Sequence, residues 1–209
     1  MRKSVLAFAA AGVSALTFGA LHAQQGGPPP PPPVHDASKV TAGTYKADPF
    51  HTQVMYNYNH LGFTTNMGLL SGANGTLTID PKAPNDAKLS IDVPMNTIHT
   101  TIDALDKELV GPMFFDAAKY PTAHFESTKV TAKGSHATVQ GNLTIHGVTK
   151  PATIDASFMA VGANPMSKKE TVAFKGTATI NRSDFGVKQF VPMVSDQVDL
   201  LITAAFEKQ

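Results

Sequence analysis

Apolar and polar residues alternate with a period of two over most of the chain beyond residue 43. This repeat is expected of β-strands that bury one face and expose the other. It is most regular in five segments, and residues rich in Gly, Pro and Asn separate these from less regular ones. Nine or ten short strands follow from the pattern, near residues 44–47, 51–60, 62–70, 73–80, 88–93, 122–131, 138–145, 152–158, 172–180 and 198–206. So many short strands indicate an all-β sandwich or barrel.

The face of the sheet that should point inward carries several small residues. They are Gly141, Ala152, Ala156, Gly176, Ala178 and Ala204. A barrel of about eight strands is either packed solid or holds one small ligand, and small inward side chains favour the ligand. Phe and Met side chains elsewhere in the chain are numerous enough to refill that volume, so a solid core remains an alternative.

One segment follows the helical period instead. Ile102, Leu105 and Leu109 fall on one face of a helix predicted over residues 101–109, a preceding threonine can cap its start, and Gly111-Pro112 ends it. A single short amphipathic helix beside a closed or nearly closed sheet predicts a lid over one mouth of the barrel.

The N-terminus differs in composition from the rest of the chain. Arg2 and Lys3 precede an almost wholly apolar run over residues 5–21 and small residues up to Ala23, so residues 1–23 are predicted to be a secretory signal peptide. Residues 24–42 are predicted to be a linker, because they include six consecutive prolines that favour extended polyproline II. The folded domain is then 43–209, and we expect it to reach the periplasm without stable membrane insertion.

Composition excludes several classes of protein. The 209 residues contain no Cys, which rules out disulfides, thiol catalysis and thiolate metal sites. The 17 Lys and Arg nearly balance the 16 Asp and Glu, so nothing recruits nucleic acid. The sequence has no nucleophile elbow, phosphate loop or paired-carboxylate motif, and we predict that the protein is not an enzyme.

The eight histidines do not form a known metal motif. No His-x-His or His-x-x-x-His spacing occurs. His51 and His60, with Asp48 nearby, leave a loose metal- or redox-active site as an alternative, although we predict no metal and assign both histidines to polar contacts at a barrel mouth.

Arg182 is the one arginine beyond residue 23, and it follows a predicted strand. Its guanidinium suits an anionic head group. A structural ion pair with Asp184 or Asp106 is the preferred interpretation, because buried charges need partners.

Several separated motifs, taken together, resemble the YceI-like family of bacterial periplasmic lipid-binding proteins. In chain order they are Tyr45–Thr52, His60-Leu61-Gly62, Asp106 with Leu109, Phe114-Phe115-Asp116, Tyr120–Phe125, Gly141–Pro151 and Asn181–Gly186. The resemblance covers about residues 43–208. It implies an extended, lipocalin-like antiparallel barrel whose interior takes up a polyisoprenoid or another long-chain amphiphile.

We therefore expect a periplasmic carrier with a long-chain ligand and no other cofactor. An apolar pocket is predicted from Met55, Phe63, Met67, Leu105, Leu109, Phe114, Phe115, Phe125, Phe158 and Phe174, and a head-group contact from His51, His60 and Arg182. The alternatives are a metal- or redox-active barrel enzyme using His51 and His60, and a structural interaction protein with a solid core. A homodimer is also possible, through the apolar residues Leu201 and Ala205 on the outer face of the last strand.

Overall fold

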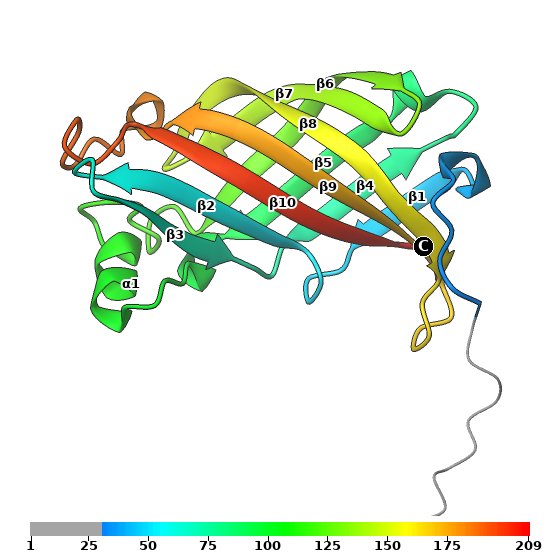
Figure 1. The fold of residues 1–209 in the computed structure, drawn as a ribbon, viewed down its shortest axis with the longest axis horizontal. Coiled ribbons are helices and arrows are strands. Elements are labelled where there is room, and N and C mark those ends of the chain that lie inside the picture. Colours follow the sequence, from blue (N-terminus) through cyan, green and yellow to red (C-terminus); the bar gives the residue numbers. More distant parts are fainter. Residues whose placement is uncertain (1–30) are drawn as a thin grey trace, which may run out of the picture.

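The computed structural model describes residues 31–209, and its main body is one antiparallel sheet of ten strands (Figure 1). In chain order they are β1 (Gly43–Ala47), β2 (Gln53–His60), β3 (Thr64–Leu70), β4 (Asn74–Ile79), β5 (Lys88–Pro94), β6 (Thr122–Lys133), β7 (His136–Ile145), β8 (Val148–Ala163), β9 (Glu170–Asn181) and β10 (Gln197–Lys208). The strands expected from the period-two repeat are therefore present. The predicted signal peptide lies outside the described residues.

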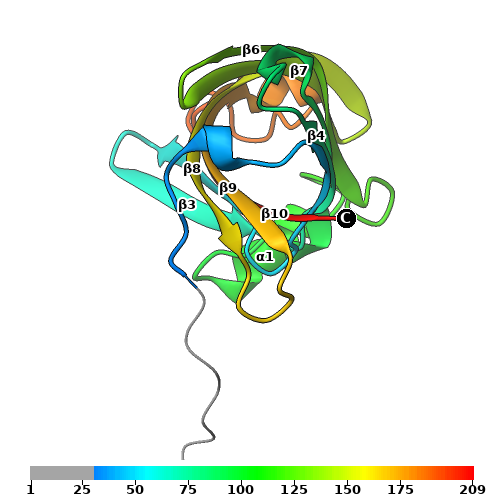
Figure 2. The ribbon, with the colours of Figure 1, turned by 90° about the vertical axis from the view of Figure 1, so that its right-hand side faces the viewer.

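The sheet closes into a barrel because β1 pairs with two strands, β4 on one side and β10 on the other. Eight strands, β1 and β4 to β10, complete the ring, which is seen end-on in Figure 2. The remaining two strands form the β2–β3 hairpin, and β2 also pairs with β10. The prediction of an antiparallel barrel of about eight strands is confirmed.

Strand β10 divides its free edge between two partners. Its residues 206–208 pair with β1, whereas residues 199–203 pair with β2. The ring is therefore closed by direct strand pairing at one end only. At the other end the β5–β6 connection meets the outer edge of β3, where the backbone groups of Leu69 and His99 exchange two hydrogen bonds of 2.8 Å.

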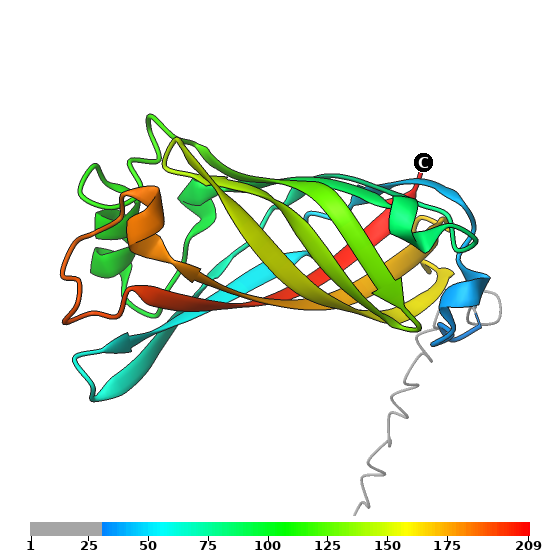
Figure 3. The same ribbon diagram turned by 90° about the horizontal axis from the view of Figure 1, so that it is seen from above.

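Within residues 31–209 the structure has a single α-helix, α1 (Asp103–Val110), and it lies in that β5–β6 connection. The observed helix starts two residues later than predicted and ends at Gly111 as expected. No side chain caps its first turn. The Asp106 carboxylate instead accepts hydrogen bonds of 2.7 Å from both the amide and the hydroxyl of Thr100. The helix lies at the barrel end that also carries the β2–β3 turn and the β9–β10 connection (Figures 1 and 3).

Part of the predicted linker, residues 24–42, contacts the barrel. Val34 and Val161 exchange two backbone hydrogen bonds of 2.8 and 2.9 Å, which fasten the segment before β1 to β8. The reason is that β8 is longer than its neighbour: β7 pairs with β8 only as far as Ser157, and the following residues have a free edge. Val34 is therefore attached to the barrel although it precedes β1 by nine residues.

Candidate functional site: a cavity along the barrel

The barrel encloses a cavity of about 990 Å³ that runs through its interior. Its ends are marked by Ser38 and Ser135 on one side and by His60 and Gln189 on the other, the side of α1. Inward-facing residues of the strands form the wall between these ends. They include Leu77, Ile79, Leu89, Ile91, Val139, Leu143, Ala152, Ile154, Ala156, Gly176, Ala178, Ile180, Val198, Leu200, Ile202 and Ala204. The central wall is therefore apolar.

The small inward residues leave this space open in the middle of the barrel. Ala152, Ala156 and Ala178 line the cavity, as the alternation predicted. Gly141 has a different role, because a Cβ there would lie only 2.5 Å from Cζ of Phe125. The glycine therefore makes room for the Phe125 ring, which lines the cavity.

Seven of the ten residues predicted for the pocket line the cavity. Leu105 and Leu109 reach it from α1, and the other five are Phe114, Phe115, Phe125, Phe158 and Phe174. The rings of Phe158 and Phe174 meet edge to face with their centroids 5.7 Å apart, and Phe174 makes a similar contact with Phe206 at 6.3 Å. These aromatic pairs line the part of the cavity that lies far from α1.

The structure places the other three, Met55, Phe63 and Met67, outside the cavity. Met55 lies between Val54 and Tyr56, which both face inward, so the pleat of β2 turns it outward. Met67 is 59% exposed on β3, and Phe63 is 87% exposed in the β2–β3 turn. Their apolar character predicted that they line the pocket. Their positions in β2, β3 and the turn between these strands place their side chains outside it.

The inward residues of β2 are instead Val54, Tyr56, Tyr58 and His60. Sequence reasoning missed the two tyrosines, although the alternation of the segment Gln53–His60 contains the signal. Their rings are nearly parallel, with an interplanar angle of 10° and centroids 6.4 Å apart. They add an aromatic wall close to α1.

Tyr56 is the most unusual polar group of this wall. Its hydroxyl is buried and has no hydrogen-bond partner among the described residues. Gly68 on β3 makes room for it, because a Cβ at that position would lie 2.3 Å from the hydroxyl oxygen. Burial, together with the nearby Tyr58 and Asp106, raises the pKa of Tyr56 above its ordinary value, so the phenol remains neutral.

Arg182 lines the α1 end of the cavity, but it does not make the predicted ion pair with Asp184 or Asp106. Its guanidinium donates four hydrogen bonds of 2.8–3.0 Å to backbone carbonyls of the β9–β10 connection. The acceptors are Val187, Gln189, Val194 and Ser195. Carbonyl oxygens therefore replace a carboxylate as partners, and burial lowers the pKa of Arg182.

Asp106 has its own partners away from Arg182. Besides the two bonds from Thr100, its carboxylate lies 2.8 Å from Nδ1 of His99. Asp106 thus joins α1 to the segment before it. This contact gives the motif residue Asp106 a structural role.

The two histidines of the alternative metal site lie far apart. His51 pairs with Asp48 at 2.6 Å on the outer surface, before β2 begins, whereas His60 lines the cavity at the far end of β2. A strand of this length separates them by roughly 25 Å. Across residues 31–209, no group of three His, Asp or Glu residues is close enough together to hold a metal ion.

Polar side chains gather at both ends of the cavity. The α1 end has Tyr58, His60, Glu108, Arg182 and Gln189, and the far end has Ser38, Lys88 and Ser135. Such a site can hold a long apolar chain in its middle and a polar group at an end. No helix in the described part of the chain is long and apolar enough to cross a membrane.

Comparisons with known proteins agree with this architecture. The model of the YceI-like domain matches residues 45–206. A UPF0312 protein of Pseudomonas paraeruginosa is 36% identical over 169 residues, which cover 80% of this chain and 88% of the relative.

Two solved structures have the same fold. BcnA of Burkholderia cenocepacia matches with a TM-score of 0.66 and 22% identity, covering 74% of this chain and 95% of that one. A polyisoprenoid binding domain from Saccharophagus degradans, implicated in plant cell wall breakdown, matches with a TM-score of 0.58 and 13% identity over 79% and 98% of the two chains. These two likenesses concern the fold alone. On the match of its barrel domain, the chain belongs to the YceI-like family.

Proposed function

We propose that the protein is a non-catalytic periplasmic carrier that holds a polyisoprenoid or a similar long-chain amphiphile inside its barrel. The observation that carries this proposal is the apolar cavity of about 990 Å³ between two polar ends. A solid-cored interaction protein would have no such space.

Burial of the apolar tail supplies the driving force. Removing apolar surface from water is worth about 25 cal/mol for each Å², before the costs of ordering the ligand. The central wall has few polar groups that a hydrocarbon chain would leave unpaired. A long flexible tail therefore fits this cavity better than a compact polar metabolite does.

The head group of the ligand is assigned to the α1 end, where His60 and Arg182 line the cavity. His51 no longer belongs to this set, because it lies on the outer surface beside Asp48. The wide separation of His51 and His60 also removes the basis of the metal- or redox-active alternative.

Three further observations support the ligand class and the compartment. The chain belongs to the YceI-like family, a protein of the same fold is described as a polyisoprenoid binding domain, and residues 1–23 have the pattern of a signal peptide.

The direct test is mass spectrometry of an organic extract from protein purified out of a bacterial periplasm without detergent. One long-chain isoprenoid, quinone or fatty amphiphile at near-stoichiometric yield is expected. A clean extract would contradict the proposal.

Filling the cavity provides a second test. Ala178→Phe places a ring in the central space, and we expect it to reduce the co-purifying lipid by about tenfold or more while the fold is kept. Thr177→Phe is the matched control, because the neighbouring residue of β9 is exposed on the outer face. Equal lipid content in the two variants would argue against a ligand inside the barrel.

A further inference from the structure

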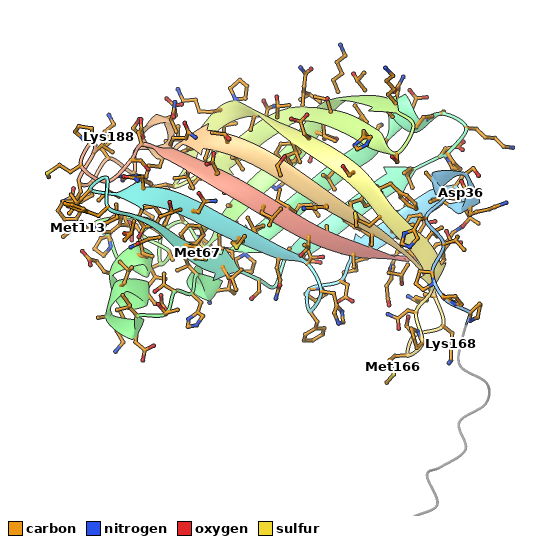
Figure 4. The ribbon with its side chains drawn as sticks, viewed as in Figure 1. Asp36, Met67, Met113, Met166, Lys168 and Lys188 are labelled. Atoms are coloured by element: carbon orange, nitrogen blue, oxygen red, sulfur yellow. The ribbon has the colours of Figure 1, made fainter. Side chains whose placement is uncertain are left out.

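The end of the barrel at α1 is surrounded by exposed apolar side chains. We name these residues the apolar rim: Leu61, Phe63, Ile102, Met113, Phe190 and Met193, with exposures between 48% and 87%. They come from the β2–β3 turn, from α1 and its flanks, and from the β9–β10 connection. Figure 4 labels Met113 and Lys188 at this end of the molecule and Met166 at the other.

The rim is one surface, because its three elements contact each other. The amide of Leu61 donates a hydrogen bond of 3.0 Å to the carbonyl of Met193, and His60 forms a β-bridge with Val194. The rings of Phe114 and Phe190 lie 6.3 Å apart and join the α1 segment to the β9–β10 connection. The four hydrogen bonds of Arg182 fix that connection from inside.

The rim is also continuous with the cavity. Ile102 and Phe190 are 54% and 48% exposed to solvent, and both also line the cavity. An apolar path therefore leads from the outer surface of the rim to the central wall. Monomeric proteins rarely expose a contiguous apolar surface of this kind unless it contacts a partner.

From this continuity we infer that the apolar rim docks the barrel mouth against a lipid bilayer, from which the ligand enters the cavity. The inference rests on the proposed function, because a long-chain amphiphile resides in membranes. Passage through water would expose its tail at about 25 cal/mol for each Å², whereas a mouth pressed against the bilayer avoids that cost.

The charges near the rim indicate which bilayer surface it fits. Both signs are present: α1 contains Asp103, Lys107 and Glu108, and the β9–β10 connection contains Lys188. A strongly basic surface would favour anionic lipids. A mixed one fits neutral, zwitterionic head groups, and Phe and Met side chains are suited to the interfacial region.

The experiment is flotation of the protein with phosphatidylcholine vesicles, with and without added phosphatidylglycerol. The test variant is Phe63→Ser/Met193→Ser, which leaves the cavity wall intact. The matched control is Phe50→Ser/Met166→Ser, which removes the same two side-chain types from positions 84% and 90% exposed in other connections. We expect the rim variant to bind vesicles about tenfold more weakly and the control to bind like the unaltered protein.

Three outcomes would overturn the inference: no flotation of the unaltered protein, equal flotation of the two variants, or a halved mass of the rim variant in sedimentation, which would make the rim a contact between two copies. Uptake of the polyprenol solanesol from ethanol tests the proposed function separately. If neither the variants nor the unaltered protein take it up, the carrier proposal fails irrespective of docking.

Discussion

Two buried tyrosines show how differently the same side chain can be used in one barrel. The Tyr45 hydroxyl is fully buried and lies 2.6 Å from both Oε1 of Glu170 and the carbonyl oxygen of Thr41. Burial, with a contribution from Glu170, raises the pKa of Tyr45 to about 12. Tyr56 has a buried hydroxyl and no such partner among residues 31–209. The first hydroxyl fastens the N-terminal segment to β9, and the second stabilises nothing by hydrogen bonding.

Removing each hydroxyl should therefore have opposite effects on stability. Tyr45→Phe removes one of the three hydrogen bonds that the Glu170 carboxylate accepts, the other two coming from the amide and hydroxyl of Thr41. We expect the loss to lower the free energy of unfolding by roughly 1–3 kcal/mol. Tyr56→Phe removes an unsatisfied group, so the free energy should stay unchanged or rise by up to about 1 kcal/mol. Urea unfolding measures both. A loss in Tyr56→Phe as large as that in Tyr45→Phe would show that its hydroxyl has a partner.

At the scale of elements, α1 is held to the barrel by the carboxylate of Asp106. Hydrogen bonding from the Thr100 hydroxyl, aided by the Thr100 amide and by His99, lowers the pKa of Asp106. A carboxyl whose native pKa lies below its unfolded value stabilises the native state above the unfolded pKa, and this contribution is lost as the pH falls through the native pKa. The α1 segment should thus loosen in acid.

Asp106→Asn tests this dependence. We expect the variant to be less stable than the unaltered protein near pH 6, and the difference to shrink as the pH falls below the unfolded pKa of about 3.9 toward the lower native pKa. Urea unfolding across that range gives the comparison, and Asp103→Asn, an exposed position on the same helix, is the control. A difference that is constant with pH would mean that the Asp106 charge does not hold the helix.

The positions of the strands and of α1 can be predicted from the sequence far better than the contacts between them. The period-two repeat located the strands, and Gly111 located the end of α1. Met55 was assigned to the pocket because its side chain is large and apolar. The register of β2 turns that side chain outward, since its neighbours Val54 and Tyr56 face the cavity. The four carbonyl acceptors of Arg182 lie on an irregular connection, where no periodic pattern predicts which backbone groups turn inward. The contact of Val34 with β8 has no local signal either, because it arises from unequal strand lengths.

At the scale of the whole molecule, the outer face of the barrel has one apolar row across three strands. Leu69 of β3 pairs with Met55 of β2, which pairs with Leu201 of β10. This row contains Leu201, which together with Ala205 is predicted to form a dimer contact.

If the row joins two copies, Leu201→Lys should convert a dimer into a monomer in sedimentation velocity. Gln140→Lys, exposed on β7, adds the same charge elsewhere and should leave the mass unchanged. An unaltered protein that sediments as a monomer would refute the contact.

The closure of the ring by β1 and β10 also determines when the cavity can form during folding. The first and last strands of the chain are neighbours, with Tyr45 opposite Lys208. The ring stays open until β10 reaches β1, because these two strands are far apart in the sequence and the long loop between them must close before they pair. The proposed ligand would therefore be enclosed only after this pairing, and removal of residues 206–208 would open the seam of the ring.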